Sequence, residues 1–244
     1  MMDTTNILLL LVKPRTTQIA LPTSPAEIIT YIDGYDGNTN TACDLQMSDS
    51  WATKNGGQHE SLNPDRPRAP NLTGRQKSLF KFDLSAIPVG STCISAVLHM
   101  FHSYNAEGGS PFVATAYAIT EANGSWIEGN GSIDIAAEGE PCWNALEADG
   151  SEGISKAWAG SAGLSTSGVD FEATAVGEIA MNPADAIGTE YQMSLNTDLI
   201  ESWFGSNDTN YGIVLWAVGN GQIHLGSSEN ITTGYRPKLV VQYS

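Results

Sequence analysis

Positively charged residues are scarce in this sequence, which has 11 Lys plus Arg against 27 Asp plus Glu and a formal net charge of −16. Binding to nucleic acid through phosphates needs a basic face, so we expect no nucleic-acid partner. From Phe82 to Tyr235 there are 19 acids and one base, Lys156, a local balance of 1 − 19 = −18 that leaves +2 for the rest of the chain. The negative charge is therefore concentrated in one part of the chain.

Cysteine and long apolar runs are scarce as well. Three cysteines without C-x-x-C spacing favour neither a disulfide framework nor a zinc site. The run ILLLLV near the N-terminus is too short for a membrane span, and Asp3 precedes it while Lys13 follows it, the reverse of a signal peptide. We predict an extended arm over residues 1–26 that docks on neighbouring subunits through this run, Ile7, Leu8, Leu9, Leu10, Leu11 and Val12.

Helical periodicity is almost missing, and short apolar runs separated by Gly, Asn, Asp and Pro dominate instead. This pattern is typical of an all-β protein, an antiparallel β-sandwich or jelly roll. We expect strands over residues 78–84, 94–102, 112–119, 211–218 and 238–243. The run at 211–218 is apolar on both faces, as in a central strand.

One short helix is predicted after Asn196 or Thr197, either of which can cap it. Leu199, Ile200, Trp203 and Phe204 then form its apolar face. Residues 48–74 and 128–176 lack a regular pattern and are expected to be long loops, where binding sites usually reside. We expect a single domain over residues 27–244.

Sequence motifs of catalysis are missing: there is no G-x-S-x-G motif, and nothing singles out a pair among the 27 acids. The sequence therefore favours a protein that is not an enzyme.

An oxygen-rich cluster precedes the first strongly apolar strand, in DGYDGNTNTACD. Ca²⁺ prefers several carboxylate and carbonyl oxygens on a flexible turn. Asx-rich turns without any ion have the same composition, so both interpretations stay open. If calcium is a cofactor, its ligands are expected to be Asp33, Asp36, Asn38, Asn40 and Asp44.

Aromatic and basic residues of the expected loops form a second candidate site, for polysaccharide. Apolar sugar faces pack on aromatic rings, and cationic side chains attract uronic acids. The alternative interpretation is that the tryptophans are internal packing anchors and that the lysines protect an exposed strand edge. The candidate ligand-binding residues are Trp51, Trp126, Trp143, Trp158, Arg75, Lys77 and Lys81.

The order of several motifs resembles the DNRLRE domain, also described as the disaggregatase-related repeat and similar to carbohydrate-binding module family 96. The motifs that carry the resemblance are KSLFKFDLSAIPVGSTCISAVLHMF, WIEGNGSIDI with its Trp-x-Glu, PCWN, LIESWFGSNDTNYGIVLWA, and SSENITTGYRPKLVVQY with its Ser-x-Glu. The resemblance covers about residues 27–244, and Arg75 stands where the family often has an Arg. It implies a non-catalytic β-jelly-roll domain associated with cell surfaces, polysaccharide binding or assembly.

Two functions follow as expectations. The first is a non-catalytic structural or decoration protein on a virion surface, whose partners are protein subunits, copies of itself included. The alternative is an adhesion module, extracellular or at the cell surface, that recognises acidic polysaccharide.

Overall fold

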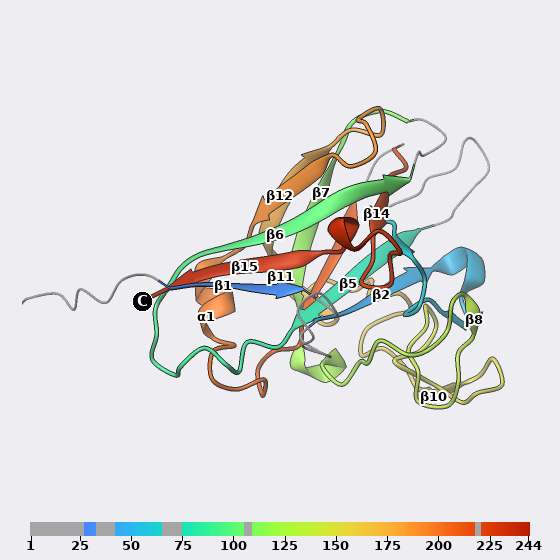
Figure 1. The fold of residues 1–244 in the computed structure, drawn as a ribbon. Coiled ribbons are helices and arrows are strands. Elements are labelled where there is room, and N and C mark those ends of the chain that lie inside the picture. Colours follow the sequence, from blue (N-terminus) through green and yellow to red (C-terminus); the bar gives the residue numbers. More distant parts are fainter. Residues whose placement is uncertain (1–26, 33–41, 65–74, 105–108, 218–220) are drawn as a thin grey trace, which may run out of the picture.

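The computed structural model describes residues 27–32, 42–64, 75–104, 109–217 and 221–244. The predicted arm, with its apolar run at 7–12, lies outside these residues, as do the predicted calcium ligands Asp33, Asp36, Asn38 and Asn40. Two antiparallel sheets pack face to face, which confirms the predicted all-β sandwich (Figure 1).

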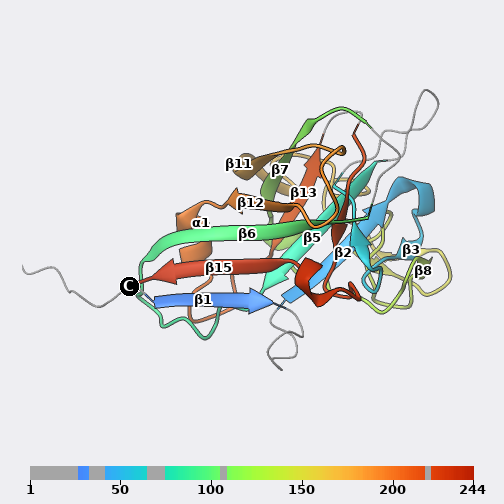
Figure 2. The same ribbon diagram turned by 45° about the horizontal axis from the view of Figure 1, so that its top comes forward.

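The first sheet has six strands in the order β1-β15-β6-β14-β4, with β12 paired to the other side of β6. Figure 2 shows β1, β15, β6 and β12 side by side. Buried and less buried positions alternate along β6 and β15, because one face of these strands packs on the core and the other faces outward. The strands are β1 (Glu27–Ile32), β4 (Ser61–Leu62), β6 (Cys93–Tyr104), β12 (Glu190–Ser194), β14 (His224–Gly226) and β15 (Lys238–Tyr243).

The second sheet has five strands in the order β11-β7-β13-β5-β2. Its inner face packs on the first sheet through residues such as Phe80, Ala116 and Leu215. Four of the five predicted strands match β5, β6, β7 and β15 closely, and the fifth is the shorter β13. The strands of this sheet are β2 (Ala42–Ser48), β5 (Gln76–Phe82), β7 (Phe112–Ile119), β11 (Phe171–Met181) and β13 (Ile213–Ala217).

The predicted helix is also confirmed as α1 (Thr197–Glu201), and Asn196 caps it by accepting a hydrogen bond from the Leu199 N–H at 2.8 Å. Ile200 and Trp203 bury their side chains in the core between the sheets. Within the described ranges, no helix has the length and apolar character that crossing a membrane requires. Three short 3-10 helices complete the helical elements described: η1 (Asp49–Trp51), η2 (Glu121–Asn123) and η3 (Thr233–Tyr235).

The expected loop at 128–176 is instead a layer of structure on the outer face of the five-stranded sheet. Together with nearby residues it encloses a second hydrophobic core, made of Leu45, Met47, Leu79, Ile119, Trp126, Trp143, Leu146, Trp158, Leu164, Phe171 and Val214. Short strands brace the layer: β3 (Lys54–Asn55) pairs with β8 (Asp134–Ile135), and β9 (Glu147–Ala148) pairs with β10 (Ile154–Lys156). The five-stranded sheet is thus covered on both faces.

Candidate functional site

The loop tryptophans do not form an exposed platform. Trp126, Trp143 and Trp158 are 2%, 7% and 3% exposed and belong to the second core, so the prediction of a surface platform is wrong for them. The indole N–H groups of two of them donate to backbone carbonyls: that of Trp126 to Tyr211 at 2.8 Å and that of Trp158 to Cys142 at 3.0 Å. Trp51, in η1, is half-buried and packs close to Gly56. The tryptophans are mainly packing anchors, since an aromatic ring gains most from complete burial.

Lys77 is an interior residue of the second core. Its side chain is buried, and its Nζ lies 3.7 Å from the centre of the Trp216 ring and donates to the Leu164 carbonyl at 2.6 Å. Burial lowers the pKa of Lys77 to about 7, against a smaller opposing effect of Asp170. The predicted role of Lys77 in attracting uronic acids at the surface is therefore wrong. Strand β5 lies between β13 and β2, so this lysine does not protect a sheet edge either.

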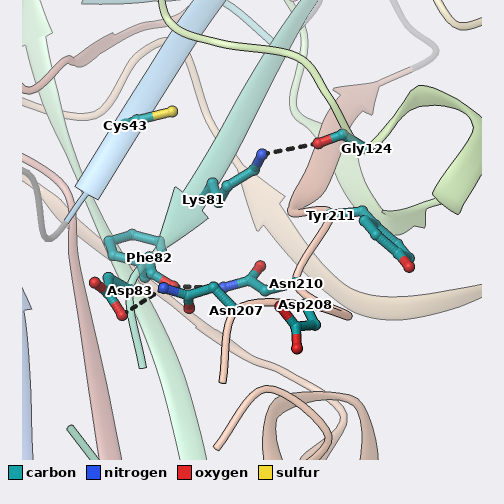
Figure 3. A pocket seen from close by; sticks show the side chains of 9 residues that line it. All are labelled: Cys43, Lys81, Phe82, Asp83, Gly124, Asn207, Asp208, Asn210 and Tyr211. Carbon is teal, nitrogen blue, oxygen red and sulfur yellow. Dashed lines mark hydrogen bonds between the residues drawn. The ribbon is translucent and has the colours of Figure 1, made fainter. Parts of the chain in front are cut away.

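Lys81 lies on the same face of β5 and lines a cavity of about 350 Å³ (Figure 3). Its Nζ donates to the carbonyls of Gly124 at 3.1 Å and Trp126 at 3.3 Å, and lies 4.7 Å from the centre of the Trp126 ring. Burial lowers the pKa of Lys81. On the opposite wall Asn207 donates to the Asp83 carboxylate at 2.7 Å. Lys81 therefore has a structural role, since its Nζ joins β5 to the segment that contains Gly124 and Trp126. Arg75, just before β5, is exposed, and its predicted role stays a prediction.

Three carboxylates from distant parts of the chain meet beside the edge strand β2. Asp44 is on the edge strand β2, Glu128 is in the segment after η2, and Glu229 follows β14. Each offers a carboxylate oxygen that lies within 4.8 Å of those of the other two. Among the described residues this is the cluster whose geometry suits a metal ion, and it includes Asp44, one of the predicted calcium ligands.

Hydrogen bonds fix the orientation of these carboxylates. The Asp44 N–H donates to Glu128 Oε1 at 2.8 Å, and the Ser228 N–H donates to Asp44 Oδ2 at 2.7 Å. Ser228 Oγ lies 2.8 and 2.9 Å from the two oxygens of Glu229 and 3.3 Å from Glu128 Oε1, and its single O–H donates to one of these oxygens at a time. Asp44 is 1% exposed, and burial, reinforced by the two glutamates, raises its pKa well above its ordinary value.

Asn55 holds the backbone of Glu128 in place. Its side chain is fully buried and donates to the carbonyls of Glu128 at 2.9 Å and Pro141 at 3.0 Å, while its oxygen accepts from the N–H groups of Gly57 and Gly131. At Gly57 a Cβ atom would lie 2.2 Å from the Glu128 carbonyl oxygen, so only glycine permits this approach. The acidic cluster is therefore built on a rigid support.

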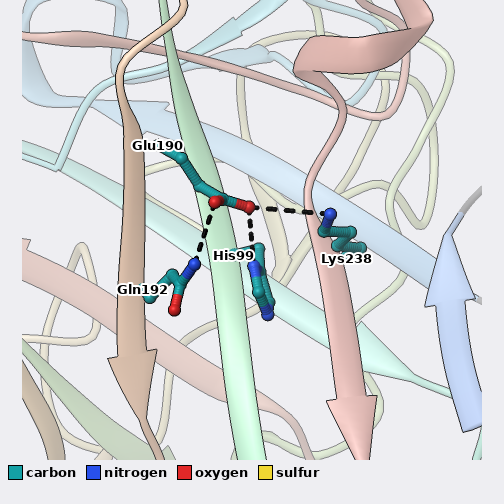
Figure 4. A network of polar contacts seen from close by, with 4 residues as sticks. All are labelled: His99, Glu190, Gln192 and Lys238. Carbon is teal, nitrogen blue, oxygen red and sulfur yellow. Dashed lines mark hydrogen bonds and ion pairs between the residues drawn. The ribbon is translucent and has the colours of Figure 1, made fainter.

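The outer face of the six-stranded sheet carries a polar network (Figure 4). Glu190 Oε1 accepts from His99 Nδ1 at 2.7 Å and lies 3.6 Å from the Lys238 Nζ, and Glu190 Oε2 accepts from Gln192 at 2.9 Å. Hydrogen bonds with His99 and Gln192 lower the pKa of Glu190 in spite of partial desolvation. The network links β12, β6 and β15 across one row of the sheet and serves mainly to join these strands.

A second open cavity, of about 530 Å³, lies where β4, β6 and β14 end. The exposed ring of Tyr104 forms one wall and meets the His224 ring edge-on at 5.6 Å. The other residues that line it are mostly polar: Gln58, His59, Glu60, Ser61, Ser103, Ser132, Asn230, Ile231 and Thr232.

Sequence reasoning found Asp44 but missed Glu128 and Glu229. Both glutamates end short motifs noted in the sequence, Trp-x-Glu at 126–128 and Ser-x-Glu at 227–229. Their presence in those motifs was a signal, but only the fold shows that they meet Asp44. Comparison with known proteins adds no further guide, because no protein-family model and no curated protein matches the chain.

Proposed function

We propose that this chain is a non-catalytic structural subunit that decorates a larger assembly, a virion surface being the setting expected from its sequence. The observation that carries the proposal is the edge strand β1. It pairs with β15 in continuous register over all six residues, and its other side pairs with no strand of the described chain.

Natural edge strands usually avoid association through bulges, prolines or charged side chains. Strand β1, EIITYI, has no register shift, no proline and no charge beyond Glu27, and Ile28 is 66% exposed. By contrast, the edge strand β11 of the other sheet has two register shifts along β7. A flat, β-branched edge of this kind is suited to accept a strand from a neighbouring subunit.

The donor we propose is the apolar run Ile7–Val12 of a neighbouring copy. Its sequence is short, extended in character and apolar, and it precedes β1 in a chain whose remaining body is strongly acidic. Backbone pairing would provide most of the affinity, so that the acidic charge can remain outside the contact.

The test is the association state of the full chain, measured by analytical ultracentrifugation over a range of concentrations. Leu9→Lys/Leu11→Lys or Ile28→Lys is expected to weaken association at least tenfold, or about 1.4 kcal/mol, by placing charge at the edge pairing. Ile231→Lys, at an exposed position in a loop, is the matched control and should associate like the wild type. Unchanged association of the first two variants would contradict the proposal.

A second candidate function, polysaccharide binding, is favoured by the Tyr104 cavity. An exposed aromatic ring next to amide, hydroxyl and imidazole groups offers the apolar and polar contacts that a sugar requires. This location replaces the tryptophan platform expected from the sequence.

The test is binding of the full chain to an array of neutral and acidic polysaccharides. Tyr104→Ala is expected to reduce retention of the bound polysaccharide roughly tenfold, or about 1.4 kcal/mol, and Val89→Ala, at another exposed position, should leave it unchanged. If the wild type retains no polysaccharide, the cavity does not serve this function.

A further inference from the structure

We propose that Asp44, Glu128 and Glu229 form a binding site for a divalent cation, Ca²⁺ by preference. The inference goes beyond the assembly role, because it concerns how the two sheets and the outer layer are joined within one subunit.

The size of the cluster fits calcium. Oxygens coordinate Ca²⁺ at about 2.4 Å, so two ligands on opposite sides of the ion lie up to about 5 Å apart. The three carboxylate oxygens lie within 4.8 Å of one another, inside that span. Mg²⁺ coordinates at about 2.1 Å, demands near-ideal octahedral geometry and retains its waters more strongly, so three fixed carboxylates suit it less. The spacing therefore accommodates Ca²⁺ with the side chains where they are.

Asp44 provides an independent indication of a ligand. Its Oδ2 accepts from the Ser228 N–H, but its buried Oδ1 has no hydrogen-bond donor among the described residues. Within the described part of the chain, the charged groups that act on Asp44 are Glu128 and Glu229, both negative. A buried carboxylate oxygen without a donor is costly, and a bound cation would coordinate it directly.

The site is preorganised by contacts that are independent of an ion. Ser228 holds Asp44 through its N–H and Glu229 through its hydroxyl, and the Asn55 amide holds the Glu128 carbonyl. Ligands fixed in this way lose little freedom on binding. The remaining coordination positions suit water, which commonly completes calcium sites.

An ion here would connect segments that are far apart in sequence. Asp44 meets Glu128 across 84 positions and Ser228 across 184. Asp44 belongs to the five-stranded sheet, Glu128 belongs to the segment that covers this sheet, and Ser228 follows β14 of the six-stranded sheet. Calcium would therefore join all three layers at one point and fix the loop that continues to Asn230 in the wall of the Tyr104 cavity.

The test uses the full chain, freed of metal with a chelator and then titrated with CaCl₂, with isothermal calorimetry and thermal unfolding as readouts. The wild type should bind one Ca²⁺ per chain, and its melting temperature should rise by about 5–10 °C when Ca²⁺ exceeds the dissociation constant a hundredfold. Asp44→Asn and Glu229→Gln should each weaken binding at least tenfold and remove most of that rise. MgCl₂ should produce a smaller rise.

The control is Glu172→Gln, an exposed position on β11, which should respond to Ca²⁺ like the wild type. In chelator, Asp44→Asn should melt above the wild type, because it removes one of three adjacent negative charges. This readout separates loss of a ligand from damage to the fold, and Glu229→Gln repeats the test at a less buried position. Absence of stoichiometric binding to the wild type, or binding that survives both substitutions, would overturn the proposal.

Discussion

Replacing Asp170 by Asn is expected to lower the free energy of unfolding by about 3–5 kcal/mol, the largest effect of any single substitution considered. The side chain is completely buried, and both of its oxygens are occupied. Oδ1 accepts from the Gly160 N–H at 2.8 Å and the Asn123 amide at 3.0 Å, and Oδ2 accepts from the N–H groups of Ser161 at 3.0 Å and Thr166 at 2.8 Å. An amide would direct its own NH₂ group at two of these donors.

Urea unfolding followed by tryptophan fluorescence measures the effect, because Trp143 and Trp158 lie in the layer that Asp170 organises. Asp149→Asn is the matched control, since Asp149 also accepts from backbone N–H groups, of Ser151 and Gly153, but at an exposed position. Water can replace those bonds, so the control should lose much less stability. Equal losses in the two variants would show that burial of Asp170 is not the source of its effect.

The second large effect concerns Lys77 and depends on pH. Folding lowers the pKa of this amine to about 7 from its ordinary value of 10.5. Between these two values the unfolded chain binds more protons than the folded one, so stability rises with pH, and below pH 7 the full cost of burying the charge is present. Relative to Lys77→Met, the wild type should gain up to about 4 kcal/mol between pH 7 and pH 10. The Trp216 ring beneath Nζ stabilises the cation by about 2 kcal/mol, which makes that gain an upper limit.

Urea unfolding of the wild type and Lys77→Met at several pH values between 6 and 10 gives the difference in their free energies of unfolding. The two proteins share every other titratable group, so the pH dependence of this difference comes from Lys77. Lys156→Met removes an exposed amine that pairs with Glu147, and its difference from the wild type should stay nearly constant across the same range. If the free energies of unfolding of the wild type and Lys77→Met change with pH in parallel, the lowered pKa of Lys77 is contradicted.

The sandwich was predictable because its strands repeat buried and exposed positions with a period of two. Strands β6, β7 and β15 and the helix α1 show their buried face in the sequence, whereas β5 shows only one of its two buried faces there. The layer at 128–176 has no such period, because its order depends on side chains that bind backbone groups, as Asp170 does. Its presence was signalled only by the run at 211–218, which is apolar on both faces since both faces of β13 are covered.

The candidate site was predictable only in part for a related reason. Asp44 stands in an oxygen-rich segment that composition singles out, whereas Glu128 and Glu229 are isolated acids among 27. Pairing of β2 with β5, and the approach of Gly57 to Glu128, bring them together across most of the chain. The local sequence pattern does not predict that these three carboxylates come together, because their contact results from tertiary packing.

The outer layer has an unusual position in the topology, since it begins after β7 and ends at β11, and these two strands pair with each other. It is in effect a much enlarged hairpin loop. Each doubling of a loop's length costs only about 0.6 kcal/mol of chain entropy, so a sandwich of this kind could carry a short turn or a whole layer at this point with little change in the rest. With a short turn, Lys77 and Lys81 would stand on an open sheet face in water. The enlarged loop covers both amines, Lys77 almost completely and Lys81 in part, and lowers the pKa of each.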